Sequence, residues 1–126
     1  MIGTLFSSTV YVKVRSNQYE LRHIEANKSV SVVATSPFTT ERLLIGQFTE
    51  AEEALSSGLN KLFAGRWFTP KPNIIIHPQE KTEGGLSQIE ERVLLEVAAG
   101  AGARRAIVWI GHELSDQDVL SKSRGI

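Results

Sequence analysis

The first third of the chain alternates hydrophobic and polar residues in the manner of β-strands. Residues 10–15 show this alternation, and it resumes over residues 19–24 after a polar turn at residues 15–18. A second turn at residues 26–28 precedes a valine-rich run at residues 29–34. The pattern predicts a meander of three antiparallel strands.

From Thr49 onward the spacing of hydrophobic residues changes to that of a helix. Apolar residues between 51 and 63 fall on one stripe, and Thr49 with Glu52 forms the pattern of a capping box. Gly65 is expected to end this helix. The uninterrupted apolar run 74–76 is typical of a strand that is buried on both faces, which makes this part of the sheet parallel.

A second helix and a second buried strand follow. Hydrophobic residues between 86 and 97 recur at helical spacing, and Ser87 and Glu90 are placed as a capping box. Glycine and alanine at residues 100–103 stop this helix. The apolar run 106–110 then predicts another buried strand.

With a short final helix at residues 115–122, the predicted order is βββαβαβα. A meander followed by right-handed βα crossovers gives a mixed five-stranded sheet with helices on its faces. This is an α/β fold of the ribonuclease H-like type. At 126 residues, the whole chain (1–126) is expected to form a single domain.

The composition narrows the possible functions. Fourteen Lys and Arg residues balance fourteen Asp and Glu residues, so neither nucleic-acid binding nor strong membrane binding is expected. The absence of cysteine excludes disulfides, thiolate metal sites and thiol nucleophiles. No apolar run is long enough to span a bilayer and the first residues do not form a signal peptide, so we expect a cytoplasmic protein.

Two motifs at a fixed separation resemble a known family. Residues 89–93, Ile-Glu-Glu-Arg-Val, and residues 100–104, Gly-Ala-Gly-Ala-Arg, resemble the V-E-R-R-A and G-A-G-A-R motifs of the bacterial actin homologue MreB. Shorter matches occur in the same order at residues 6–8, 31–34, 45–46 and 72–78. The resemblance covers nearly the whole chain, but only the front part of a two-lobed, actin-like ATPase. It implies an actin-like fold and an association with bacterial cell shape or the cytoskeleton.

Compared with this family, the phosphate-binding residues at the end of the first strand have changed. The family has D-L-G-T there, and the corresponding residues in this chain are Lys13, Val14, Arg15 and Ser16. Lys13 cannot hold a metal ion as the family's Asp does, and Arg15 adds a side chain where glycine lets the backbone approach the phosphates. Lys13 and Arg15 either form an altered anion site or are solvated charges on one face of a strand.

The region after the strand at residues 106–110 departs from the family in the same way. The family has E-E-P-M there, with a Glu that orients the attacking water, whereas this chain has Ile110-Gly111-His112-Glu113. Glu113 is displaced by about two residues, which is too far for catalysis. The second phosphate loop and the adenosine-binding lobe have no counterpart. We therefore expect no catalytic residue, no metal and no cofactor.

Two other groups of residues are candidates for a site. His23, His77 and His112 all lie near predicted strand ends, so they are either a metal-binding cluster on one rim of the sheet or ordinary polar positions. Trp67 and Phe68 form an aromatic pair at a helix end, either as anchors of a protein interface or as core residues.

These observations predict a non-catalytic, actin-like protein-interaction module. A lobe without its partner lobe exposes apolar surface, so we expect self-association or docking on a protein such as an actin-like filament protein. Trp67, Phe68 and the final helix are the predicted contact residues. Two alternatives stay open: a nucleotide-binding or ATPase lobe that a second chain completes, and a sheet domain unrelated to actin, which would have a different strand order.

Overall fold

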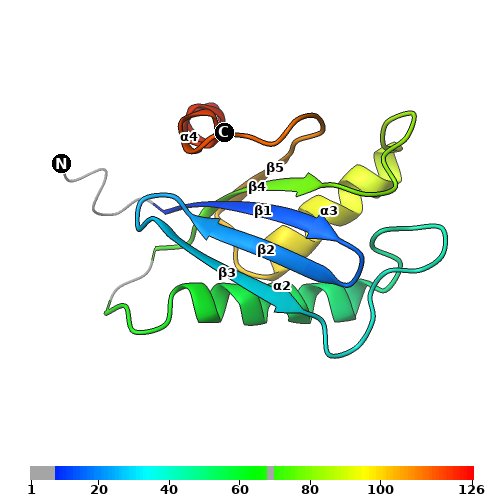
Figure 1. The fold of residues 1–126 in the computed structure, drawn as a ribbon, viewed down its shortest axis with the longest axis horizontal. Helices are drawn as coiled ribbons and strands as arrows, with labels where there is room; N and C mark the ends of the chain where they lie inside the picture. The colour runs from blue at the N-terminus through cyan, green and yellow to red at the C-terminus, as the bar shows by residue number, and fades with distance from the viewer. Residues whose placement is uncertain (1–7, 68–69) are drawn as a thin grey trace.

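The computed structural model describes residues 8–67 and 70–126, and its elements follow the predicted order. A five-stranded sheet has the order β3-β2-β1-β4-β5 and is accompanied by three helices (Figure 1). The strands are β1 (Thr9–Arg15), β2 (Gln18–His23), β3 (Lys28–Val33), β4 (Asn73–Pro78) and β5 (Arg105–Val108). The helices are α2 (Phe48–Leu62), α3 (Gln88–Gly100) and α4 (Asp116–Arg124).

The sheet is mixed, as the sequence predicted. β1 pairs antiparallel with β2, and β2 pairs antiparallel with β3. β4 runs parallel to β1 on its other side, and β5 runs parallel to β4. The β1–β2 turn is tight because Asn17 adopts a positive φ of 57°, a conformation that asparagine tolerates better than most residues.

Helices cover the two faces of the sheet unequally. α2 and α3 pack on one face, where alternate residues of the strands join them in the larger core. α4 packs on the other face over β1 and β4, where Tyr11, Ile75 and Val119 belong to a smaller core. β1 and β4 are therefore covered on both sides, while β2 and β3 are covered by α2 on one side only.

Burial confirms one predicted strand and corrects another. Ile74, Ile75 and Ile76 of β4 are fully buried, as expected for a strand covered on both faces. The run 106–110 is not a fully buried strand: β5 ends at Val108, its first residue is exposed and the rest are half-buried. The reason is position, because β5 is an edge strand that pairs with β4 alone.

The two predicted capping boxes differ in outcome. Ser87 accepts from the Glu90 backbone N–H and the Glu90 side chain accepts from the Ser87 N–H, which confirms the box at α3. The box of Thr49 and Glu52 is wrong, since α2 begins at Phe48 after Gln47 and has no side-chain cap.

The preceding loop determines where α2 begins. The backbone N–H groups of Gly46 and Gln47 both donate to the Phe38 carbonyl and place the chain for entry into the helix. α2 ends at Leu62, and Gly65 lies in the turn that follows, with a φ of 80°.

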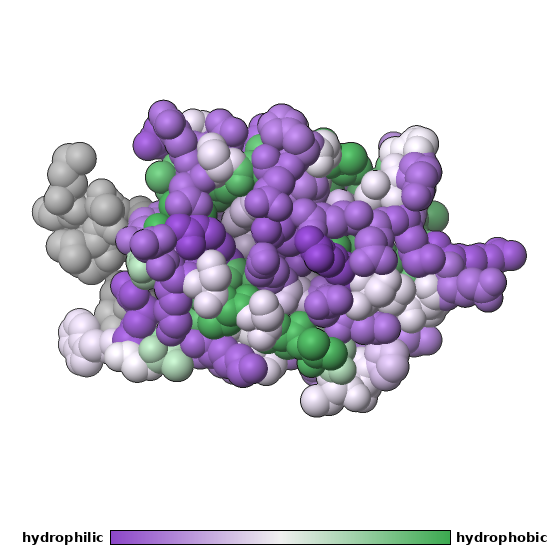
Figure 2. All heavy atoms as spheres, viewed as in Figure 1, coloured by the Kyte–Doolittle hydropathy of each residue, from purple (hydrophilic) through white to green (hydrophobic). Residues whose placement is uncertain are grey.

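The uncovered side of β2 and β3 is hydrophilic. Gln18, Glu20, Arg22, Ser29 and Ser31 all point away from the larger core, and Val33, which is 71% exposed, is the one apolar side chain of β2 and β3 on this side. Figure 2 shows the corresponding face of the molecule, where hydrophilic residues predominate around small hydrophobic patches. The expected apolar surface is therefore not on this face of the sheet. Within residues 8–67 and 70–126, no helix combines the length and apolar character needed to cross a bilayer.

Candidate functional site

The carboxyl ends of β1 and β4 bring together the residues that the resemblance to MreB aligns with a phosphate site. Lys13 lies near the end of β1, and its amine is 3.1 Å from a Glu20 carboxylate oxygen and 3.2 Å from one of Glu113. Partial burial alone lowers the pKa of Lys13, but its hydrogen bonds to the two carboxylates outweigh this effect and raise the pKa above the usual value. The amine is thus charged and neutralised within the protein.

Arg15 and Ser16 are also occupied by neighbours. The Arg15 guanidinium donates to the Gln79 side-chain oxygen at 2.9 Å. Ser16 donates twice to the Glu80 carboxylate, from its backbone N–H at 3.0 Å and from its hydroxyl at 2.6 Å. These two hydrogen bonds lower the pKa of Glu80, so its carboxylate stays ionised.

The charged groups at this edge already have partners within the chain. Three cations, Lys13, Arg15 and Lys81, lie among three carboxylates, those of Glu20, Glu80 and Glu113. The backbone N–H of Ser16 already donates to a carboxylate, so it is not available to a phosphate oxygen. This geometry disfavours the reading of Lys13 and Arg15 as an anion site. The reading as solvated strand-face charges fits Arg15, which is exposed, but not Lys13, whose side chain is 15% exposed and ion-paired.

Beneath the ion pairs, a buried tyrosine and histidine connect three segments. The Tyr11 hydroxyl and His77 Nδ1 are 2.6 Å apart, and His77 Nε2 is 3.0 Å from the Gly111 carbonyl oxygen. Because a carbonyl only accepts, Nε2 bears the proton and Nδ1 accepts from Tyr11. The Leu114 N–H completes the chain by donating to the Tyr11 oxygen. Burial lowers the pKa of His77 and raises that of Tyr11, so both are neutral at pH 7.

The three histidines do not form one cluster. His23 pairs in register with Val10 at the start of β1, whereas His77 pairs with Lys13 near its end, so the two histidines lie at opposite ends of the sheet. His112 contacts the edge of the Trp109 ring. The part of the chain that the structure describes contains no group of three potential metal ligands. The predicted alternative of a histidine rim site is therefore wrong.

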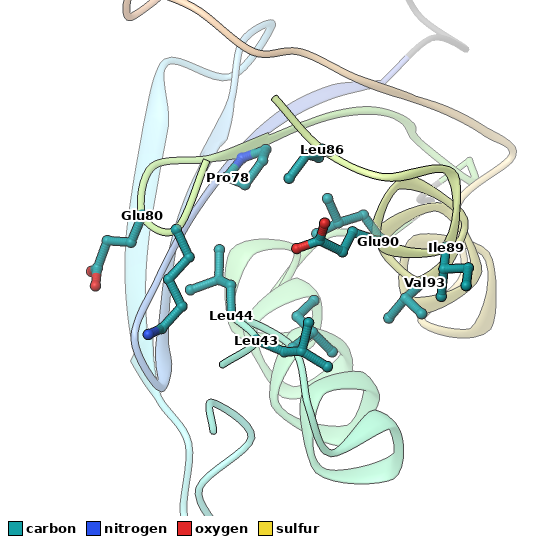
Figure 3. Close-up of a pocket in the computed structure, with 11 residues that line it drawn as sticks. Leu43, Leu44, Pro78, Glu80, Leu86, Ile89, Glu90 and Val93 are labelled. Atoms are coloured by element: carbon teal, nitrogen blue, oxygen red, sulfur yellow. The ribbon is translucent and has the colours of Figure 1, made fainter. Parts of the chain in front are cut away.

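An apolar hollow lies beside the ion-paired edge (Figure 3). It has a volume of about 410 Å³, including the part open to solvent. Leu44, Ile45 and Leu94 are buried and form its floor, while Leu43 and Ile89 on its rim are 40% and 76% exposed. Pro78, Leu86 and Val93 complete its apolar wall.

Three segments form this hollow, one of them distant in sequence from the other two. The loop before α2 contributes Leu43 and Leu44, the end of β4 contributes Pro78, and the start of α3 contributes Ile89 and Val93. Figure 3 shows the leucines of the loop facing the α3 side chains across the gap. The loop is fixed by hydrogen bonds, including one from the Lys81 amine to the Glu41 carbonyl at 2.6 Å. The hollow is therefore a formed feature of the fold.

The surroundings of the hollow have an excess of acid. Glu80 and Glu90 line it directly, and Glu41 and Glu83 are adjacent in the two loops. Three cations accompany these four carboxylates: Arg42 and Lys81, and Arg15 beside Glu80. An apolar group with positive charge around it matches this surface best.

The opposite end of the sheet has the reverse character. Trp67 follows α2 there and is 99% exposed, which excludes the reading of Trp67 as a core residue; Phe68 lies outside the described residues. The exposed cations at this end are Lys28, Lys61, Arg66, Lys71, Arg104 and Arg105. Glu25 lies among them, but its carboxylate accepts from the backbone and the hydroxyl of Thr9.

His23 is buried at this basic end without a hydrogen bond to either ring nitrogen. Its Nε2 is 3.6 Å from a Glu25 carboxylate oxygen, and its ring meets Phe63 edge-on at 4.9 Å. Burial is the main cause that lowers the pKa of His23, and the charges of Arg66 and Lys28 lower it further against the opposing effect of Glu25. The imidazole is thus held neutral.

Comparison with known proteins identifies a protein of similar sequence. The chain is 38% identical over 99 residues to the uncharacterized protein YjaA of Escherichia coli (strain K12), and the alignment covers 75% of this chain and 76% of YjaA. The chain belongs to the YjaA family. No family model matches the sequence, so the resemblance to MreB stays a prediction.

In this member of the YjaA family, the features that the sequence did not predict depend on tertiary contacts between separate segments of the chain. Leu43, Leu86 and Ile89 looked like ordinary loop and helix residues, and only their convergence makes a hollow. The Tyr11–His77 pair spans 66 residues and has no local motif. The single signal that could have indicated the hollow is Ile89, an isoleucine one position after the start of a capped helix, where polar residues are usual.

Proposed function

We propose that this protein is a non-catalytic protein-interaction module. Its working surface is the apolar hollow, which receives a large apolar side chain that is flanked by basic residues on the partner. The observation that supports this most is an open, apolar and acid-rimmed hollow beside an edge whose lysine, Lys13, is already neutralised by two carboxylates.

The groups that would contact a nucleotide phosphate already have partners within the chain. The positions that would face a nucleotide phosphate are Lys13, Arg15 and Ser16, and each is held by a carboxylate or amide from elsewhere in the chain. A phosphate entering this edge must displace Glu80 from Ser16 or Glu113 from Lys13. The neutral, mutually bonded Tyr11 and His77 lie below and are buried.

The broader assignments belong to the same proposal. The strand order, a meander joined to two parallel strands, supports a ribonuclease H-like fold. The actin-like kinship, the cytoplasmic location and a link to bacterial cell shape come from the resemblance and from the composition. We propose them as the setting in which the module works.

Calorimetric titration with magnesium ATP tests the non-catalytic part. We expect no heat of binding and no phosphate release. Micromolar binding with phosphate release would instead establish the alternative, a nucleotide-binding lobe.

The hollow itself is tested with N-acetyl-tryptophanamide, a minimal aromatic probe, in a two-dimensional amide NMR titration. We expect concentration-dependent shifts at Leu44, Leu86 and Val93, and loss of these shifts in Ile89→Glu. The control is Val33→Ser, because Val33 is an exposed apolar residue on β3 away from the hollow. Shifts scattered over the surface, or unchanged by Ile89→Glu, would contradict the assignment of the hollow.

A further inference from the structure

The basic end of the molecule has the chemistry that the hollow requires. Trp67 is a large aromatic side chain that is 99% exposed, and it follows Arg66 and precedes Lys71. Resting on the proposed function, we propose that the partner is a second copy of this chain, whose Trp67 enters the hollow and whose cations face the acidic rim.

The two surfaces lie at opposite ends of the chain's own sheet. The basic end surrounds Asn73, where β4 begins, and the hollow includes Pro78, where β4 ends. The six residues of β4 span roughly 20 Å, so one chain cannot insert Trp67 into its own hollow. Figure 1 shows the loop after α2 and the loop before α2 at the two ends of the long axis.

The charges of the two ends are complementary. Six exposed cations lie at the end of the sheet where Trp67 is located, while four carboxylates and three cations surround the hollow. The net charge of the chain is zero, so copies do not repel each other as whole molecules. The separation of charge therefore favours a head-to-tail approach over pairing of like ends.

This contact is heterologous, because each copy offers a different surface. Each copy that docks its Trp67 keeps an empty hollow at its other end, so addition continues into short chains unless the geometry closes a ring. With one aromatic anchor, the contact is weak and depends on protein concentration.

An anionic membrane or a nucleic acid would also suit the basic end, because a tryptophan beside cationic side chains contributes to binding in both cases. Neither uses the acidic, apolar hollow. A second copy accounts for both ends at once, and for this reason we favour it.

Sedimentation velocity of the full chain over a wide concentration range tests the proposal. We expect the weight-average sedimentation coefficient of the wild type to rise with concentration and to fall back at high salt. Trp67→Ala and Ile89→Glu should each weaken association at least tenfold. Val33→Ser should leave it unchanged.

Mixing the two defective variants gives the sharpest result. Trp67→Ala keeps an intact hollow and Ile89→Glu keeps an intact Trp67, so an equimolar mixture should form dimers that grow no further. An interface that pairs like ends of two copies predicts no such rescue. Circular dichroism on both variants checks that they are folded.

The possible outcomes separate the two proposals. A wild type that stays monomeric while the aromatic probe still binds the hollow overturns the second copy and leaves the proposed function intact. A monomer that does not bind the probe overturns both. Binding to phosphatidylglycerol vesicles or to single-stranded RNA that depends on Trp67, without self-association, also overturns the second copy.

Discussion

The two ends of the β1–β4 strand pair contain similar residue types in opposite arrangements. At the carboxyl end, Lys13 is neutralised by two carboxylates and both nitrogens of His77 are hydrogen-bonded. At the amino end, exposed cations surround Trp67, and both nitrogens of the buried His23 lack hydrogen bonds. The comparison shows that the end resembling a phosphate site is filled with internal contacts, while the cations at the other end are exposed to solvent.

The largest expected effect separates the two buried histidines. His77→Leu removes two hydrogen bonds and leaves the Tyr11 hydroxyl proton and the Gly111 carbonyl unpaired, so we expect a loss of about 3 kcal/mol in the free energy of unfolding. His23→Leu breaks no hydrogen bond and should be neutral or stabilising. Urea denaturation measures both, and equal losses in the two variants would contradict the comparison.

The second largest expected effect is the dependence of stability on pH. Burial lowers the pKa of both His23 and His77 from the ordinary value of 6.5, so the folded state favours the neutral imidazoles. Below 6.5 the unfolded chain takes up protons that the folded chain does not, so this stability is complete above that pH and is lost as the pH falls. Urea denaturation between about pH 7 and pH 5 should show the decline, and His23→Leu should reduce its slope. A stability that rises on acidification would refute this account.

The helix beside the hollow offers a smaller effect. Ser87→Ala removes the confirmed cap of α3 and should cost about 1 kcal/mol. Thr49→Ala removes a hydroxyl that caps nothing, and we expect a change within about 0.5 kcal/mol. Thermal denaturation compares the two variants, and a larger loss at Thr49 would restore the capping box that the structure does not contain.

The smallest expected effects on the free energy of unfolding are those of substitutions in surface ion pairs and on the rim of the hollow. Lys13→Met should cost at most about 1 kcal/mol, since its partners Glu20 and Glu113 are half-exposed or more. Ile89→Glu should change stability by less than about 0.5 kcal/mol, because Ile89 is mostly exposed. Chemical denaturation of both variants checks this. A large loss for Ile89→Glu would mean that the rim of the hollow is part of the core.

The sequence predicted the positions of the helices and strands better than it predicted how deeply each one is buried. Alternation at residues 10–15 and 19–24 and the apolar run at 74–76 correctly indicated the meander and the central strand, because burial on one or two faces imposes those patterns directly. The same reasoning misjudged the burial of residues 106–110, since position at the sheet edge depends on pairing and not on composition.

For the candidate site, the sequence indicated the charged residues at the end of β1 but not the partners that they contact. Lys13 and Arg15 were recognised as unsuitable for a nucleotide, yet their partners come from segments up to about one hundred positions away. The zero net charge gave no sign that acidic and basic residues lie at different ends of the sheet, because composition does not say where residues lie in the fold. The exposure of Trp67 likewise became visible only in three dimensions.

Because the chain contains no cysteine, crosslinking between introduced cysteines tests the head-to-tail docking most directly. Arg66→Cys, which keeps Trp67, is mixed with Ile89→Cys in a glutathione redox buffer, and Val33→Cys replaces Ile89→Cys as the control. The account predicts a disulfide-linked dimer of Arg66→Cys with Ile89→Cys that forms well ahead of either self-pair and of the control pair. Equal rates for all pairs would contradict it.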